Sequence, residues 1–317
     1  MASPAIAVVG STMTDLVTYV QRAPEAGETV VGDRFVVGYG GKGANQAVMA
    51  RRLGASVAFV GCLGDDSYGD RYLAHLADEG VDVTAVHRVP CPSGVAPIWV
   101  EPDGTNRIIV VPGANDALTP SRAQQAVQQL SDVQVVVGQL EVPQAATAAG
   151  LAAARQRGAI TVLNPAPYAS VSAELLAQAD WMVPNEVEFT ELAREHQVGP
   201  ADGADPRDEA QVRALAEVLG CGLVVTLGAD GAAVLVGSQV HRVQAPAVRA
   251  VDTTGAGDGF VGAFVVGLAQ GLDPLAAARL GCACASWSVE RDGTQTSYPS
   301  AQQATELRTR LAAELET

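Results

Sequence analysis

Basic residues are scarce, and almost all of them are arginine. The 317-residue chain has 20 Lys and Arg against 35 Asp and Glu, a formal net charge of −15, and Lys42 is its only lysine. Wrapping a nucleic-acid backbone requires a broad basic face, so this balance argues against a nucleic acid as partner. It does not exclude a small phosphorylated ligand, because local backbone dipoles can bind such a group.

Cysteine, histidine and long apolar runs are also scarce. The five cysteines form no C-x-x-C pair and the four histidines stand at no metal-ligand spacing, so neither a disulfide framework nor a structural zinc site is predicted. The longest weakly polar run, near 260–270, is too short to span a bilayer, and the first residues lack the basic region of a secretory signal. We therefore expect a soluble cytoplasmic protein with no membrane partner.

Apolar runs of strand length alternate with helical patterns along most of the chain. Strands are expected at 6–9, 57–60, 133–137, 160–163, 181–183 and 223–226, and a hairpin at 232–243. Helices are expected at 44–53, 68–78, 145–155, 209–219, 256–269 and 274–289, with others beginning near 173 and 185. Strands separated by such helices predict an α/β fold with a Rossmann-like parallel sheet covered on both faces. We expect one such domain over residues 1–317.

Two stretches interrupt this alternation. Residues 18–37 and 94–111 are extended and rich in β-branched residues, with turn sequences and no helix between them. They predict one small antiparallel sheet, a lid inserted at about 16–38 and 94–112, that covers a site at the edge of the main sheet. Two decorative hairpins remain the alternative. Apolar residues such as Ile98, Trp99 and Val100 would suit pairing of two such lids.

A first glycine-rich segment, GYGGKGAN at 38–45, opens directly into a helix. Glycines allow a close approach to a ligand, and Lys42 places a compact ammonium there. The segment also fits G-x-G-x-x-G, with Asp65 and Asp66 about twenty residues further on, so a dinucleotide-dependent oxidoreductase is one interpretation. It is no Walker A loop, because Gly43 follows the lysine where Ser or Thr is required. A tight turn without a ligand is the structural alternative.

A second segment, DTTGAGD at 252–258, runs into another helix. Small residues at a helix start leave backbone N–H groups free to surround an anion. Asp258 lies in the first turn, beside this cradle, where it is suited to accept a proton. A carboxylate next to an anion cradle is what phosphoryl transfer to a hydroxyl group requires. A helix-capping aspartate behind a glycine-rich turn is the alternative.

A third set of polar residues follows the predicted strands. Asn185 and Glu188 form a possible helix-capping box, and the turn at 226–231 could equally close a hairpin. In a parallel sheet, however, the carboxyl ends of the strands share one edge, where ligands collect. The segments expected at this edge are 10–15, 139–141, 164–165, 185, 226–231 and 258.

In these segments the chain resembles the ribokinase-like family of carbohydrate kinases, over Val8 to Pro299. GGKGANQAVMARRLGA at 40–55 and DTTGAGDGFVGAF at 252–264 correspond to the two signature regions of that family, in the same order. Six shorter segments agree with it as well: GSTMTD at 10–15, GAN at 113–115, QLE at 139–141, LNPAP at 163–167, PNEVE at 184–188 and GTQTSYP at 293–299. The resemblance implies ATP-dependent phosphorylation of D-ribose at its 5-hydroxyl, giving D-ribose 5-phosphate, and a homodimer formed through the lid.

The resemblance also implies a role for particular residues. Asp258 would be the general base, and Gly255, Ala256 and Gly257 the anion hole. The sugar would contact Met13, Asp15, Gly41, Lys42, Gly43, Asn45, Glu141 and Asp258, and ATP would contact Asn185, Thr226, Gly228, Gly231, Gly257 and Cys282. Asn185 and Glu188 would be linked to Mg²⁺, and a monovalent cation such as K⁺ would bind at Asp252, Thr254, Ser288, Arg291, Gly293 and Ser297.

Two positions depart from the family pattern. Met13 stands where many members have an asparagine that contacts the sugar, so selection for a 2-hydroxyl could be relaxed, which makes 2-deoxyribose or another furanose or nucleoside the alternative substrate. Cys282 stands where an asparagine or histidine often neighbours the nucleotide base. A non-catalytic sugar-binding protein is a further alternative, but Lys42, Glu141 and Asp258 are all intact.

Overall fold

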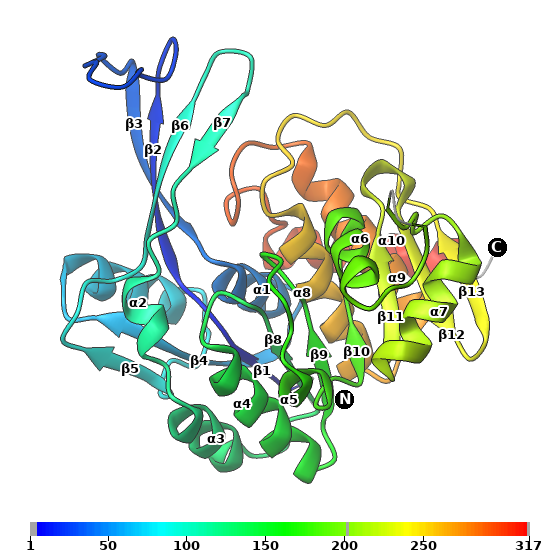
Figure 1. Cartoon of the computed structure of the whole chain (residues 1–317). Coiled ribbons are helices and arrows are strands. Elements are labelled where there is room, and N and C mark those ends of the chain that lie inside the picture. The colour runs from blue at the N-terminus through cyan, green and yellow to red at the C-terminus, as the bar shows by residue number, and fades with distance from the viewer. Residues whose placement is uncertain (1–4, 201–202, 316–317) are drawn as a thin grey trace.

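Two β-sheets of different size organise the molecule (Figure 1). The computed structural model describes residues 5–200 and 203–315. Its larger sheet has nine strands in the order β13-β12-β11-β10-β9-β8-β1-β4-β5. These are β1 (Ala5–Val9), β4 (Ser56–Gly64), β5 (Val86–Val89), β8 (Val135–Gly138), β9 (Ile160–Leu163), β10 (Trp181–Met182), β11 (Gly222–Thr226), β12 (Ala232–Val236) and β13 (Gln239–Val243).

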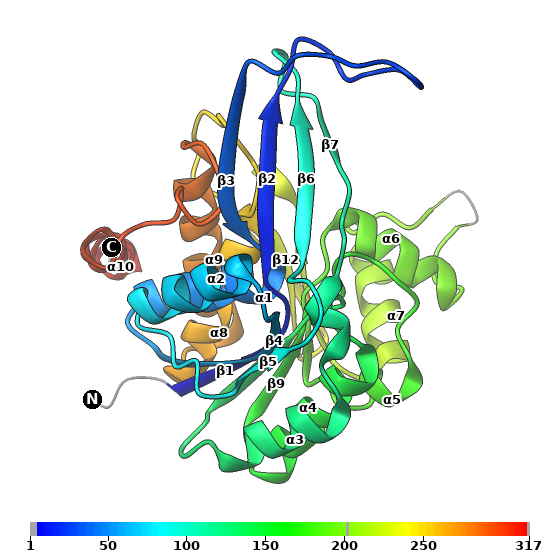
Figure 2. The same cartoon turned by 90° about the vertical axis from the view of Figure 1, so that its left-hand side faces the viewer.

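Helices cover both faces of the larger sheet because its strands are apolar on both sides (Figure 2). Ile6 and Val8 of β1 belong to one buried cluster, while the alternate residues Ala7 and Val9 belong to another. The first cluster includes residues of α1 (Lys42–Arg52), α2 (Ser67–Asp78), α8 (Ala256–Ala269), α9 (Pro274–Val289) and α10 (Ala301–Leu315). The second includes residues of α3 (Pro120–Gln129), α4 (Gln144–Gln156), α5 (Ala173–Leu176), α6 (Glu186–Glu195) and α7 (Glu209–Leu219).

The predicted α/β architecture is confirmed, with one refinement of the sheet. From β11 to β5 neighbouring strands are parallel, whereas β12 and β13 form an antiparallel edge, the predicted hairpin. The sheet is therefore mixed. α3, α10 and β5 were not expected from the sequence pattern. In the described part of the chain, no helix has the length and apolarity needed to cross a bilayer.

The smaller sheet is the predicted lid, and it projects beyond the main sheet (Figures 1 and 2). Its strands lie in the order β3-β2-β6-β7, with bounds β2 (Met13–Tyr19), β3 (Arg34–Gly40), β6 (Val95–Val100) and β7 (Asn106–Ile108). The expectation of a wholly antiparallel lid is wrong, because β2 and β6 pair in parallel. The two strands follow the parallel strands β1 and β5 and leave the main sheet in the same direction, which explains this pairing.

The apolar surface of the lid differs from the sequence expectation. Ile98, Trp99 and Val100 are half-buried rather than exposed. The exposed apolar side chains of the lid lie on its other strands, for example Phe35 of β3 at 59% exposure and Ile108 of β7 at 50%. The inserted strands are thus as predicted in position, but a different set of residues forms the apolar face.

Candidate active site

Segments far apart in the sequence meet around a cavity of about 170 Å³ at the carboxyl edge of the main sheet. The cavity lies beyond the ends of β9, β10 and β11 and beside the first residues of α1, α6 and α8. Its lining residues are Lys42, Asn164, Ala166, Val183, Asn185, Glu188, Thr226, Gly255, Gly257, Asp258 and Val261. The structure therefore brings together the lysine of the first glycine-rich segment, the acid of the second, and the Asn185–Glu188 element.

The first glycine-rich segment packs on the protein itself. The first three amides of α1 already donate to protein groups: Lys42 N to Glu141 Oε2 at 2.8 Å, Gly43 N to Ser11 Oγ at 3.4 Å and Ala44 N to the Ser11 carbonyl at 3.0 Å. A pyrophosphate would need such amides to be free. The helix start that fits G-x-G-x-x-G therefore has no amide among these three to offer a dinucleotide.

The acidic residues of that dinucleotide interpretation are engaged elsewhere. Asp66 caps α2, accepting from the amides of Gly69 and Ser93, each at 2.8 Å. Asp65 is exposed and lies 3.6 Å from Arg88. Neither residue lines the cavity. Geometry thus gives the oxidoreductase interpretation no support.

The start of α8 differs from that of α1 because part of it is free. Gly255 is the N-cap residue in a left-handed conformation (φ 75°). The Ala256 amide donates to the Thr253 carbonyl at 3.2 Å, but within the described residues the amides of Gly257 and Asp258 have no hydrogen-bond acceptor. Gly255 and Gly257 line the cavity, whereas Ala256 does not. Two unpaired amides at a helix N-terminus form a cradle for an anionic oxygen.

The Asp258 carboxylate is fixed at the mouth of this cradle. It is 7% exposed, and it accepts hydrogen bonds from Asn45 Nδ2 at 2.8 Å and Gln46 Nε2 at 3.3 Å. Both donors come from α1, so the two glycine-rich segments are joined through this one carboxylate. Its two oxygens retain further lone pairs, which makes it a proton acceptor oriented by neutral amides.

A network of buried amides holds these donors in place. Of its members, Gln46 and Gln295 had no role predicted from the sequence, whereas Asn45 was expected at the sugar and the segments 139–141 and 164–165 at the ligand edge of the sheet. Gln46 also bonds Asn164 Oδ1 at 3.1 Å and accepts from Gln139 Nε2 at 2.6 Å, while Gln295 Nε2 donates to Asn45 Oδ1 at 2.9 Å. One signal was available: Gln46 lies four residues after Lys42, on the same face of α1. The partners of Gln46 come from other strands, so no local pattern reveals them.

Lys42 is the cation of the cavity. Burial lowers the pKa of its ammonium group, but the carboxylates of Asp258, Glu141 and Glu188 raise it, and the net result is a pKa above the ordinary value. The side chain is therefore charged at neutral pH. A cation surrounded by acids that converge on an anion cradle can neutralise charge that develops there.

Asp15 of β2 lies beside this cluster, on the lid side. A Cβ atom at Gly40 would lie 2.4 Å from Asp15 Oδ2, so glycine at that position leaves room for the carboxylate. Burial and the nearby charge of Glu141 raise the pKa of Asp15 to about 7. Its ionisation therefore occurs near neutral pH, unlike that of an exposed aspartate.

This raised pKa predicts how stability depends on pH. Between the unfolded value of 3.8 and about 7, the folded protein retains a proton that the unfolded chain has lost, so the free energy of unfolding falls as pH rises through this window. Asp15→Asn removes this ionisable group and with it the loss of stability at high pH. The substitution should therefore raise the free energy of unfolding by about 2 kcal/mol more at pH 8 than at pH 5. Thermal unfolding at both pH values measures this gain. Asp65→Asn, at an exposed position, is the control, and an equal gain at both pH values for Asp15→Asn would contradict the assignment.

Asn185 and Glu188 form the capping box of α6 and also line the cavity. Asn185 Oδ1 accepts from Glu188 N at 2.8 Å, and Glu188 Oε2 accepts from Asn185 N at 2.8 Å. Burial raises the pKa of Glu188, an effect that the hydrogen bond from Asn185 and the charge of Lys42 oppose. The cap of α6 therefore also presents a buried carboxylate to the cavity.

The expected nucleotide positions lie in different surroundings. Thr226 lines the cavity and forms a backbone bridge with Asn185. Gly228 and Gly231 shape the short helix η2 (Gly228–Asp230) and its end, and a Cβ at Gly231 would lie only 2.0 Å from the Val243 carbonyl oxygen. Cys282 is 3% exposed with its sulfur 3.9 Å from the same oxygen, and burial raises its pKa to about 12. It does not line the cavity.

Met13 and the residues expected to bind a monovalent cation also lie outside the cavity lining. Met13 is 3% exposed, with its Sδ atom 3.7 Å from Asn115 Nδ2. Among the cation positions, the Asp252 carboxylate accepts from the amides of Thr254 at 2.9 Å and Gly293 at 2.8 Å. Burial would raise the pKa of Asp252, but these hydrogen bonds bring it below the ordinary value.

Chain contacts bring the six cation positions into one loop region. The Asp252 amide donates to the Val289 carbonyl at 3.2 Å, Arg291 N donates to the Ser288 carbonyl at 3.0 Å, and Ser297 N donates to the Thr294 carbonyl at 3.2 Å. The Arg291 guanidinium lies over the Trp287 ring, 4.0 Å away, and carries no oxygen, so the only group of Arg291 that could ligate a cation is its backbone carbonyl. Carbonyl and carboxylate oxygens are suitable for an alkali cation. Among the residues the structure describes, no group of three or more His, Cys, Asp or Glu side chains is arranged so that it could hold a metal ion.

Comparison with known proteins identifies the family of the chain. Residues 3–301 match the model of the pfkB family carbohydrate kinase. The chain is 38% identical to a deoxyribokinase of Salmonella typhi over 303 residues (95% of this chain, 97% of the relative) and 38% identical to a ribokinase of Mus musculus over 304 residues (93% and 92%). The structure of Arabidopsis thaliana ribokinase complexed with ribose and ATP superposes with a TM-score of 0.86 at 31% identity, covering 97% of this chain and 99% of that one. The chain belongs to the pfkB family of carbohydrate kinases.

Proposed function

We propose that the protein transfers the γ-phosphoryl group of ATP to the 5-hydroxyl of D-ribose, giving D-ribose 5-phosphate. The observation that carries the proposal is the position of Asp258, whose carboxylate lies beside the two unpaired amides at the start of α8 and in the same cavity as Lys42. In this mechanism Asp258 takes the proton of the attacking hydroxyl. The amides of Gly257 and Asp258 and the dipole of α8 stabilise the charge on the transferred group.

The sugar would lie between the lid and the start of α1. Asp15 and Glu141 supply carboxylate oxygens on that side, while Asn45 and Gly41 belong to the segment that carries Lys42. Sugar hydroxyls donate to such carboxylates, and the lid strands would exclude water while the phosphoryl group moves. The Arabidopsis relative was solved with both ribose and ATP, which supports this pairing of substrates.

The phosphates of ATP would enter from the side of α6. Asn185, Thr226 and the turn that includes Gly228 and Gly231 would contact the nucleotide, and the oxygen donors of Asn185 and Glu188 fit a Mg²⁺ ion. Mg²⁺ would supply charge neutralisation at the phosphates. A K⁺ ion would be held by the oxygens around Asp252, next to the segment that leads into α8.

A second candidate substrate is 2-deoxyribose, and Met13 favours it. The thioether is buried against Asn115. The family resemblance implies that it stands where many members have an asparagine that contacts the sugar. A thioether is at best a weak hydrogen-bond acceptor and cannot bind a 2-hydroxyl as an amide does. The chain is 38% identical to a deoxyribokinase and equally 38% identical to a ribokinase, so both sugars are tested.

Met13→Asn tests whether this position sets the preference between the two sugars. A gained hydrogen bond to the 2-hydroxyl should raise the ratio of kcat/KM for ribose to that for 2-deoxyribose by about three- to tenfold. The comparison is made with both sugars at saturating ATP. Met13→Leu is the matched control, because it keeps an apolar side chain at the same position, and it should leave the ratio unchanged. An unchanged ratio in Met13→Asn would exclude a role for residue 13.

We further propose that two lids pair in a homodimer. The exposed apolar side chains Phe35, Val36 and Val37 on β3 and Ile108 on β7 give the lid an apolar surface that a second copy could cover. Light scattering that finds only monomer at micromolar concentration would contradict this pairing.

A further inference from the structure

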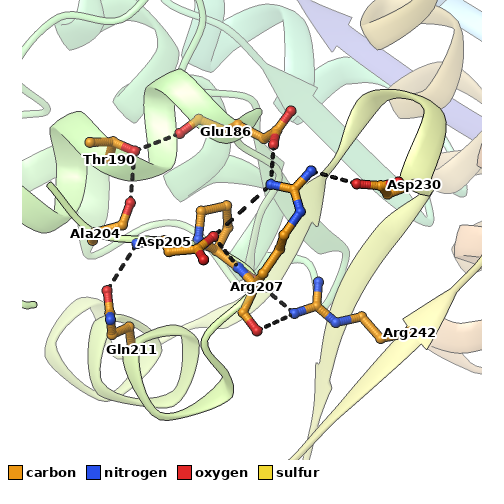
Figure 3. Close-up of polar contacts among 9 residues, drawn as sticks. Glu186, Thr190, Ala204, Asp205, Arg207, Gln211, Asp230 and Arg242 are labelled. Carbon is orange, nitrogen blue, oxygen red and sulfur yellow. Dashed lines mark hydrogen bonds and ion pairs between the residues drawn. The ribbon is translucent and has the colours of Figure 1, made fainter.

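Arg207 occupies the space between two turns that flank the cavity (Figure 3). Its Nη1 atom lies 2.5 Å from Glu186 Oε1, and its Nη2 atom lies 2.5 Å from Asp230 Oδ2. Glu186 is the first residue of α6 and directly follows Asn185, while Asp230 is the last residue of η2. One guanidinium therefore connects the two turns that the proposed function assigns to ATP.

The backbone that carries Arg207 is itself anchored. Arg242 Nη2, from β13, donates to the carbonyl of Arg207 at 2.7 Å and to that of Pro206 at 3.2 Å. On the other side, Thr190 Oγ1 of α6 donates to the Ala204 carbonyl at 3.0 Å. Arg207 therefore projects from a segment held at both ends, which reduces the conformational freedom that weakens most exposed ion pairs.

Within the described residues, the other hydrogen bonds that join the two turns lie at their base. Thr226 pairs with Asn185 as a backbone bridge, and its amide donates to the Pro184 carbonyl at 3.0 Å. At the outer ends of the two turns, the carboxylates of Glu186 and Asp230 face the same guanidinium, which also lies 4.0 Å from the carboxylate of Asp205 on its own segment. Without that cation they would repel each other and present uncompensated negative charge beside the path of an anionic nucleotide.

We infer that Arg207 is a positioning residue for the nucleotide, which sets ATP affinity by holding the Asn185–Glu186 turn and the η2 turn together and offsetting part of the negative charge of their carboxylates. The hydrogen bonds to Asp230 and Glu186 raise its pKa, so the group is charged at all working pH values. This inference rests on the proposed function for the identity of the nucleotide. Arg207 does not line the cavity, so it acts through the two turns and not on the reacting atoms.

Arg207→Gln tests this role, with Arg213→Gln as the matched control. Arg213 pairs with Glu209 on α7 at 3.5 Å and is about as exposed as Arg207, with 43% of its side chain accessible against 46%. Arg207→Gln should raise the KM for ATP about fivefold and leave kcat and the KM for the sugar within about twofold. Arg213→Gln should change none of the three. The increase should shrink at high salt, because the pairs are screened there.

A second comparison separates a direct coupling from general destabilisation. In an Asp230→Asn background, Arg207→Gln should raise the KM for ATP by a smaller factor than in the wild type, because one of its partners is already neutral. Independent effects of the two changes would overturn the inference, as would equal increases in the KM values for ATP and sugar. Calorimetry without any sugar measures the affinity of the same variants for ADP, which should change in the same way as the KM for ATP. If the wild type phosphorylates no pentose, the proposed substrate fails while this binding comparison still tests Arg207.

Discussion

Replacing Asp258 with asparagine should lower kcat about a thousandfold while the KM for the sugar changes little, because general-base catalysis contributes factors of about 10² to 10⁴. The carboxylate lies at the mouth of the α8 cradle, where it accepts hydrogen bonds from both Asn45 and Gln46. Asparagine keeps the shape but cannot accept the proton of the attacking hydroxyl. Steady-state kinetics of ADP release, with sugar and ATP varied separately, measure the effect.

The Asp258→Asn variant needs a stability control, because Asn45 and Gln46 both donate hydrogen bonds to the side chain of residue 258. An amide at residue 258 would turn one NH₂ group toward a donor, so Asp258→Asn should also lose some stability. Asp273→Asn is the matched control: Asp273 is likewise an aspartate at a helix start, where it caps α9 by accepting from Leu275 N and Ala276 N. Asp273→Asn should keep full turnover. A folded Asp258→Asn protein with near-normal kcat would remove Asp258 from the mechanism.

Adding one methyl group at Gly257 should abolish most activity without harming the fold. A Cβ atom at this position would meet no atom of the protein within 4 Å, and the residue lines the cavity inside the first turn of α8. Alanine is favoured over glycine in a helix, so Gly257→Ala should be as stable as the wild type or more stable by up to about 1 kcal/mol. The methyl group would occupy the space of the transferred phosphoryl group, so kcat/KM for ATP should fall about a hundredfold.

Gly255→Ala provides the contrast. Gly255 has a φ of 75°, and a Cβ there would lie 2.4 Å from Thr294 Cγ2. This variant should therefore lose stability together with activity, whereas Gly257→Ala separates the two. Thermal unfolding and kinetics of both variants make the comparison. Normal activity in Gly257→Ala would show that no phosphoryl group lies against that turn.

The alternation of strands and helices could be predicted because it depends on local patterns. The bounds of α7, α8 and α9 agree with the sequence interpretation, and the strand ends meet at one edge as expected. The parallel pairing of β2 with β6 could not be derived locally, because it follows from which strands of the main sheet feed the lid. α3 was not predicted, although Thr119 followed by Pro120 is a helix-start signal.

The site shows the same division between local and long-range information. Lys42, Asn185, Glu188, Thr226 and Asp258 were recognised from motifs and do line one cavity. The amides that orient Asp258 could not be assigned, because each bond joins residues from different elements. The sequence also suggested an anion cradle at both glycine-rich segments. Only coordinates reveal that the first amides of α1 are already paired while Gly257 and Asp258 keep theirs free.

Conversion of ATP and ribose to identified products is the most direct test of the account. The purified protein is incubated with ATP, Mg²⁺ and D-ribose or 2-deoxyribose, with and without K⁺, and the products are followed by phosphorus NMR. The account predicts ADP together with a pentose phosphorylated at its 5-hydroxyl, and no transfer to 5-deoxyribose, which lacks that group. ATP left intact with every pentose, or phosphate on a different hydroxyl, would contradict it.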